Sequence, residues 1–143
     1  MREKIVVTGY GIITSLGNGI EATKRMLQSK QRCIRSIRHL NTIHTDLPCG
    51  EVSESDEELR DQLGISPDTA TTRNPLLAMT ALKEAIATSR ITPDTPTAFI
   101  SGTTVGGMEK SEDAYTDFFK GGNTQFIATH DCGSGTDFAS RLF

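Results

Sequence analysis

The residues best suited to chemistry stand near the end of the sequence, in the run "HDCG". His130, Asp131 and Cys132 supply the side-chain types of a general base, an orienting acid and a nucleophile. Consecutive side chains of an extended segment point to opposite faces, and working Cys–His pairs are usually assembled from distant positions. Buried cysteines mostly behave as inert small hydrophobic residues. The run therefore predicts no catalytic residue, and a nucleophilic Cys132 is the less favoured interpretation.

The thiols and imidazoles of the chain form no ligand pattern. The three cysteines are an odd number without a CxxC spacing, so neither a disulfide framework nor a zinc site is predicted. The histidines also lack metal-ligand spacing. We therefore predict no metal site and a reducing compartment. The residues concerned are Cys33, Cys49, Cys132, His39, His44 and His130.

Two glycine-rich turns are candidate binding sites. Gly9 and Gly11 follow an apolar run, but the third glycine of a dinucleotide fingerprint is replaced by Thr14 and the next helix comes late. A tight turn is favoured over a nicotinamide site. In the second turn, within Ser101–Asp113, the glycines could expose backbone N–H groups to a ligand. Alternatively, Gly106 and Gly107 merely allow close packing, and the sequence does not decide between the two.

Strands and helices alternate around these turns, which predicts an α/β fold. Short apolar runs ended by glycine predict two buried strands, Lys4–Gly9 and Thr97–Gly102, and Leu47–Val52 is a candidate for a third, brief strand. Gln31–Asn41 is predicted to be an irregular loop. Helical spacing predicts helices over 20–29, from Ser55 to Gly64, from an Asn74 cap and Pro75 to the break at 92–96, and over 106–120 with a stop at 121–123. The closing run is typical of a turn followed by the first turns of a helix.

Composition and charge exclude several classes of protein. The net charge is −3 and the pI is near 5.6, with nothing that suggests a nucleic-acid footprint. The N-terminus lacks the apolar stretch of a signal peptide, and no segment has the ~18 consecutive apolar residues of a membrane span. The sequence therefore predicts a cytoplasmic protein without nucleic-acid or membrane partners.

Three segments in the same order resemble a known family. The opening "KIVVTGYGIITSLGNGIEATKRML", the turn "AFISGTTVGGM" and the close "HDCGSGTDFASRLF" are similar to the N-terminal part of a β-ketoacyl-acyl-carrier-protein (ACP) synthase, a condensing enzyme. The resemblance implies the N-terminal part of a thiolase-like αβαβα layered sandwich with a mixed sheet. It also implies decarboxylative condensation of an acyl thioester with malonyl-ACP, in a homodimer that needs no cofactor.

The resemblance also implies where the chemistry would lie. The family nucleophile belongs to a "TACSS"-like segment, which this chain of 143 residues does not contain, and the two catalytic histidines come later still. The chain, residues 1–143, is therefore expected to be an inactive part truncated before the catalytic cysteine. Val105, Gly106 and Gly107 match the acyl-pocket gate of the family. Thr104 replaces a frequent glycine, and Thr124–Thr129 lacks the family's aromatic segment, so substrate preference and dimer packing are expected to differ.

Two alternatives to an active condensing enzyme follow. The first is a catalytically silent ketosynthase-like subunit that binds an active homologue, and the second is a Rossmann-like NAD(P)-binding module. The isolated chain is expected to aggregate or pair, because its strand edges and the apolar faces around Leu76–Ile86 and Tyr115–Phe119 would lack neighbours.

Overall fold

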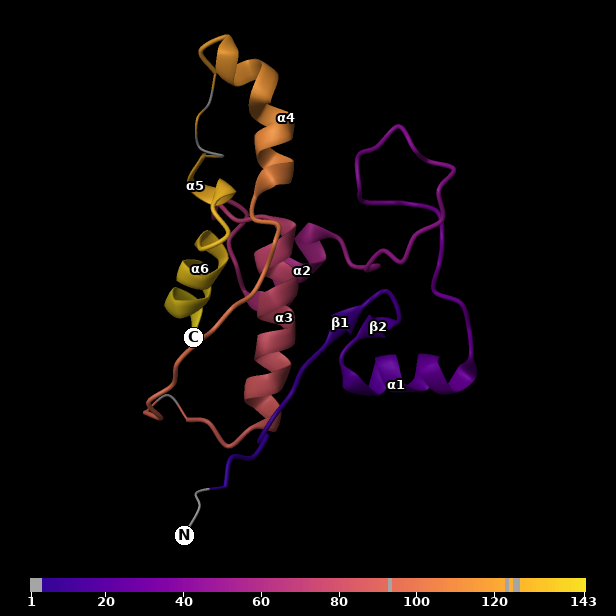
Figure 1. The fold of residues 1–143 in the computed structure, drawn as a ribbon, viewed down its shortest axis with the longest axis vertical. Coiled ribbons are helices and arrows are strands. Elements are labelled where there is room, and N and C mark those ends of the chain that lie inside the picture. The colour runs from indigo at the N-terminus through magenta and orange to yellow at the C-terminus, as the bar shows by residue number, and fades with distance from the viewer. Residues whose placement is uncertain (1–3, 93, 123, 125–126) are drawn as a thin grey trace. The chain divides into compact units, whose positions relative to one another are not determined.

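The computed structural model describes residues 4–92, 94–122, 124 and 127–143 (Figure 1). The chain divides into two compact units, Met1–Ser55 with Thr80–Ile91, and Asp56–Met79 with Thr92–Phe143. The elements are β1 (Ile13–Thr14), β2 (Gly17–Asn18), α1 (Ile20–Ser29), α2 (Asp56–Leu63), α3 (Arg73–Thr88), α4 (Met108–Phe119), α5 (Ile127–His130) and α6 (Ser134–Leu142). The helix α3 contributes to both units.

The first unit is built from a hairpin, a helix and the second half of α3. The strands β1 and β2 pair antiparallel, with Thr14 opposite Gly17, and contact α1. The segment before them lies against α3 at two glycines. A Cβ at Gly9 would collide with the carbonyl oxygen of Ala85, and one at Gly11 with that of Ala81. These glycines therefore permit close packing of two backbones, as the alanines that face them do.

One carboxylate joins the hairpin, α1 and α3. The N-cap of α1 is Gly19, which has no side chain to bond the free N–H groups of the first turn. Glu84 of α3 takes the place of a capping side chain, because its Oε1 accepts the N–H of Ile20 at 2.8 Å. Its Oε2 accepts the N–H of Ile12 at 3.0 Å, just before β1. A negative charge at a helix N-terminus is also favourable to the helix dipole.

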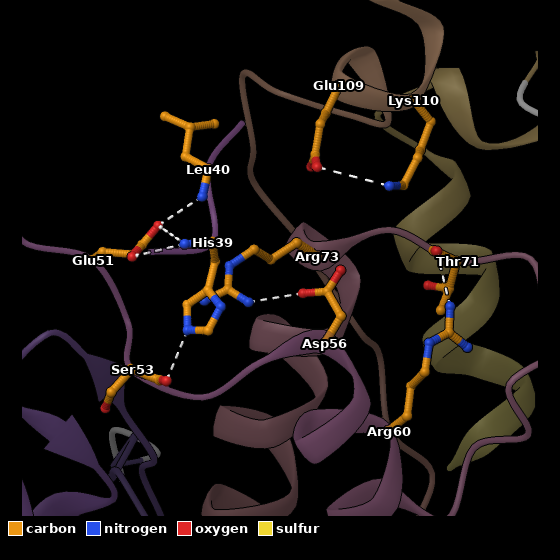
Figure 2. A network of polar contacts seen from close by, with 10 residues as sticks. All are labelled: His39, Leu40, Glu51, Ser53, Asp56, Arg60, Thr71, Arg73, Glu109 and Lys110. Atoms are coloured by element: carbon orange, nitrogen blue, oxygen red, sulfur yellow. Dashed lines mark hydrogen bonds and ion pairs between the residues drawn. The ribbon is translucent and has the colours of Figure 1, made fainter. Parts of the chain in front are cut away.

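The loop that follows α1 is irregular, as predicted, and is organised by Glu51. Its carboxylate accepts the backbone N–H groups of Arg38, His39 and Leu40 at 2.7–3.2 Å. Figure 2 shows the contacts with His39 and Leu40. Burial alone would raise the pKa of this carboxyl, but the three N–H donors and the charge of His39 outweigh it and hold the pKa below its ordinary value of 4.5.

Acidification should therefore loosen this loop. A carboxyl whose pKa is lowered on folding stabilises the folded form above its unfolded pKa, and that stability is lost as the pH falls through the folded value. We expect amide exchange at 38–40, normalised to intrinsic rates, to accelerate as the pH falls below 4.5. Glu51→Gln should accelerate it already at neutral pH and remove the pH dependence, and an unchanged profile in that variant would contradict this role of the carboxylate.

The second unit consists of α2, the first half of α3 and α4 to α6. Leu59, Leu76 and Met79 are its fully buried large side chains among the described residues. In contrast, α4 buries none of its residues and contacts α5, which contacts α6. Aromatic side chains of α4 remain exposed, including Tyr115 and Phe119, as expected from the sequence. On the α3 face that was also expected to be exposed, Leu76 and Met79 are buried, and Leu82 and Ile86 are half-buried.

The predicted helices are confirmed, but the predicted strands are wrong for this chain. Lys4–Gly9 and Thr97–Gly102 have no strand structure, and Ile5 is 100% and Ile100 is 91% exposed. A strand requires a hydrogen-bonded neighbour, and no described residue pairs with either run. Of Leu47–Val52, only Cys49 forms an isolated bridge, to Arg35. The sheet of the described residues is the two-stranded hairpin, and these residues by themselves form no layered sandwich.

Candidate functional site

The turn that carries the predicted pocket residues lies between the apolar run 97–102 and α4. Val105 is 51% exposed, and Gly107 is the buried N-cap of α4. Gly107 has an ordinary φ of −84°, so it is not required for a left-handed backbone. The position of this turn is instead fixed by two sets of contacts, one polar and one steric.

The polar contacts come from Asn74. Its Nδ2 donates to Thr103 Oγ1 at 2.9 Å and to the carbonyl oxygen of Val105. Thr103 Oγ1 also accepts the N–H of Val105 at 3.1 Å. Asn74 was predicted to cap α3, and this is wrong: the helix already begins at Arg73, which leaves the side chain of Asn74 available to the turn. The sequence offered no signal for this contact across 31 residues.

The steric contacts involve the glycine pair. A Cβ at Gly106 would collide with the carbonyl oxygen of His130 and would lie 2.9 Å from the backbone nitrogen of Cys132. A Cβ at Gly107 would collide with the carbonyl oxygen of Thr129. Backbone atoms cannot rotate away as side chains do, so both positions exclude any larger residue. The close-packing interpretation of the two glycines therefore describes their surroundings in this structure.

A small hollow of about 60 Å³ lies beside the turn. A water molecule occupies about 30 Å³ of the liquid, so the hollow has room for about two waters. This is well below the roughly 300 Å³ at which ligand pockets begin. The hollow is lined by Asn74, Pro75, Ala78, Met79, Phe99, Ser101, Gly102, Thr103, Gly106, Cys132, Ser134 and Gly135.

The triplet at 130–132 does not converge on a common point. His130 Nδ1 lies 2.7 Å from Ser111 Oγ, and Asp131 Oδ1 accepts the N–H of Gly133 at 2.7 Å. Cys132 is exposed and lines the small hollow. The imidazole and the carboxylate thus hold α4 and the start of α6 rather than the thiol. Among the described residues, no three His, Cys, Asp or Glu side chains gather as a metal site would require.

Two arginines hold the segment that leads into α3 and hence to Asn74. Arg73 forms an ion pair with Asp56 of α2 at 2.8 Å (Figure 2). Arg60 donates to the carbonyl oxygens of Ser66, Thr69 and Thr71 at 3.1–3.2 Å. Both are charge-assisted contacts, which are about twice as strong as neutral hydrogen bonds. They fix the approach of the chain to the Asn74 end of α3.

A comparison with known protein families shows the class of protein to which this chain belongs. A family model matches residues 2–137, nearly the whole chain, and implies an α/β fold of the thiolase-like class. Its description is Beta-ketoacyl synthase, N-terminal domain, and the chain belongs to this family of condensing enzymes. No curated protein and no solved structure matches the chain. In the described part of the chain, no helix has the length and apolar character needed to cross a membrane.

Proposed function

We propose that the protein acts as a 3-oxoacyl-ACP synthase, which condenses an acyl thioester with malonyl-ACP in fatty-acid or polyketide synthesis. The family match over residues 2–137 is the observation that carries this proposal. Acyl and malonyl thioesters and an acyl carrier protein would be its partners, in a cytoplasmic homodimer that uses no cofactor. Specificity toward a particular chain length would set the pathway.

We further propose that residues 1–143 are one part of the complete αβαβα sandwich and are inactive alone. Two observations support this division. The imidazoles of His39 and His130 contact the carbonyl oxygen of Ser53 and the hydroxyl of Ser111 rather than a thiol, and a catalytic cysteine and two histidines would come from another part of the protein. The apolar runs 4–9 and 97–102 are exposed and unpaired among the described residues, as strands without their neighbours would be. Pairing them in a mixed sheet would bury both.

In the complete enzyme, Val105, Gly106 and Gly107 would border the acyl pocket. Asn74 holds the carbonyl of Val105, and the two glycines fix the turn against 129–132, so the Val105 side chain is attached to a well-held backbone. The small hollow would then be the end of a channel completed by other residues. A β-branched side chain at its rim would limit the length of the acyl chain.

A loading and condensation assay tests this function. The complete protein is incubated with acyl thioesters of short and long chains, followed by malonyl-ACP. We expect a mass increase equal to the acyl group and then a 3-oxoacyl product. Val105→Phe should lower kcat/KM for the long acyl chain about ten-fold relative to the short one. Loading with no change in this ratio would contradict the pocket role of Val105.

A silent ketosynthase-like subunit is the alternative. It is favoured by the contacts of His39 and His130, whose rings lie against the carbonyl oxygen of Ser53 and the hydroxyl of Ser111 rather than a cysteine. If the complete protein acquires no acyl group but restores activity to a homologous enzyme, the silent role holds and the condensing activity is excluded.

A further inference from the structure

A second hollow, larger than the one beside the turn, lies between the start of α3 and the helix α6. Its volume is about 290 Å³, close to the roughly 300 Å³ at which ligand pockets begin. The helix α6 approaches α3 at Gly135, where a Cβ would lie 3.3 Å from Pro75 Cγ. All lining residues of this α3–α6 hollow belong to the second unit. They include Thr71, Thr72, Pro75, Asp137, Phe138 and Arg141.

Two threonines in the wall of the α3–α6 hollow have buried hydroxyl groups without a hydrogen-bond partner. Thr72 is 3% exposed, and neither its Oγ1 nor that of Thr71 has a partner among the described residues. Thr72 directly precedes α3, where a threonine hydroxyl usually accepts the N–H of the second or third helical residue. The third residue of α3 is Pro75, which has no N–H. Rotation about χ1 exchanges the hydroxyl with the methyl group, so each hydroxyl can turn toward a ligand that satisfies it.

Two opposite charges line the same hollow. Asp137 and Arg141 are four residues apart on α6, so they lie on one face of the helix, and both are exposed. In the described part of the chain, neither side chain forms an ion pair or a hydrogen bond. A guanidinium binds a carboxylate through two parallel hydrogen bonds, and a carboxylate accepts hydrogen bonds from an ammonium group. The hollow therefore offers separate binding groups to a ligand with one negative and one positive charge.

We propose that the α3–α6 hollow binds a small α-amino acid with an apolar side chain. Arg141 binds its carboxylate and Asp137 its ammonium group, while Phe138 provides apolar contact. The hydroxyls of Thr71 and Thr72 gain the partner that they lack. The volume equals that of about ten water molecules, which suits a ligand of about ten non-hydrogen atoms, such as leucine. A nucleotide is too large and carries more negative charge than one guanidinium balances. The proposal does not depend on condensing activity.

Calorimetric titration of the complete protein with L-leucine tests the proposal. We expect saturable binding with a Kd of roughly 1 mM or below. Isocaproate lacks the ammonium group of leucine and isoamylamine lacks its carboxylate, so each should bind about ten-fold more weakly or worse. The hydroxy acid α-hydroxyisocaproate keeps the carboxylate and replaces the ammonium group by a hydroxyl. If it binds as tightly as leucine, the assignment of an amino acid is wrong. Absence of saturable leucine binding would overturn the whole proposal.

Variants of the charged residues assign the site to this hollow. Arg141→Gln should weaken leucine binding about ten-fold or more, because the bidentate contact with the carboxylate is lost. Asp137→Asn should lower the affinity for leucine toward that for isocaproate. Arg90→Gln and Asp117→Asn make the same changes of charge at exposed positions outside the hollow and should leave the Kd unchanged. Equal losses in Arg141→Gln and Arg90→Gln would overturn the proposal.

A further variant tests the buried hydroxyl itself. Thr72→Val removes the hydroxyl and keeps the shape of the side chain, so it should weaken leucine binding about five- to ten-fold. The ligand-free variant should resist urea as well as the wild type does, because this hydroxyl has no partner to lose among the described residues. A Thr72→Val protein that binds leucine with unchanged affinity would contradict the role of the hydroxyl.

Discussion

Gly107→Ala should destabilise the chain by about 2–3 kcal/mol, because the added methyl group meets backbone that cannot move aside. A Cβ at this position would collide with the carbonyl oxygen of Thr129 and would lie 2.6 Å from its carbonyl carbon. The turn and the 129–132 segment would have to separate, and the contact between α4 and α5 would be lost with them. Urea unfolding followed by circular dichroism measures the loss.

Two further variants isolate the steric cause. Gly102→Ala lies in the same exposed segment, but nothing stands within 4 Å of its added Cβ. Gly102→Ala should leave the free energy of unfolding unchanged or raise it by up to about 1 kcal/mol, because alanine reduces the conformational entropy of the unfolded chain. Alanine is also a poor N-cap residue, and Gly107 is the N-cap of α4. Gly107→Ser restores a good cap and keeps the Cβ, so it should remain destabilised. If Gly107→Ser is as stable as the wild type, the steric explanation is wrong.

Helices could be predicted from this sequence because their signals are local. The helix over 20–29 was predicted with the limits that α1 has, and α2 begins directly after Ser55 and ends before Gly64. Gly64 has the positive φ of +71° that a helix-ending glycine commonly adopts. Gly121, in the predicted stop of α4, has a φ of +80°, whereas Asn123 of that stop lies outside the described residues. Capping and periodicity need only neighbouring residues.

Strands could not be predicted in the same way, because a strand is defined by its partner. The run 4–9 has the β-branched composition of a buried strand, and the structure leaves it extended and exposed. The β-branched composition indicates only that the side chains of this run would pack well in a sheet. Whether it becomes a strand depends on hydrogen-bonding groups that lie far away in the sequence.

The candidate site was only partly predictable for a related reason. The glycine pair and Val105 were located from the resemblance, but the backbone that excludes a side chain at Gly106 and Gly107 lies more than 20 residues away, at Thr129 and His130. Asn74 was assigned a local role as a cap, but it bonds across the unit to Thr103 and Val105. A side chain that can satisfy a local partner can equally satisfy a distant one, and propensity does not distinguish them.

Glu84→Ala is the second substitution for which we expect a large effect, a destabilisation of about 2–3 kcal/mol. Hydrogen bonds to a charged group contribute about 1.5–3 kcal/mol each, and partial exposure of this carboxylate reduces the two contributions. The substitution leaves the N–H groups of Ile12 and Ile20 without their acceptor. Glu84→Gln should lose about half as much, because its amide keeps one oxygen acceptor and no charge.

Amide exchange gives the sharper measurement, because it reports these two N–H groups directly. In Glu84→Ala, exchange at Ile12 and Ile20 should accelerate more than exchange within the core of the second unit. Glu112→Ala removes an exposed carboxylate in the middle of α4 and should change stability by no more than about 0.5 kcal/mol. If Glu84→Ala behaves like this control, the carboxylate does not join the hairpin and α1 to α3. The N-terminus of α1 would then be uncapped, since Gly19 offers no side chain to replace it.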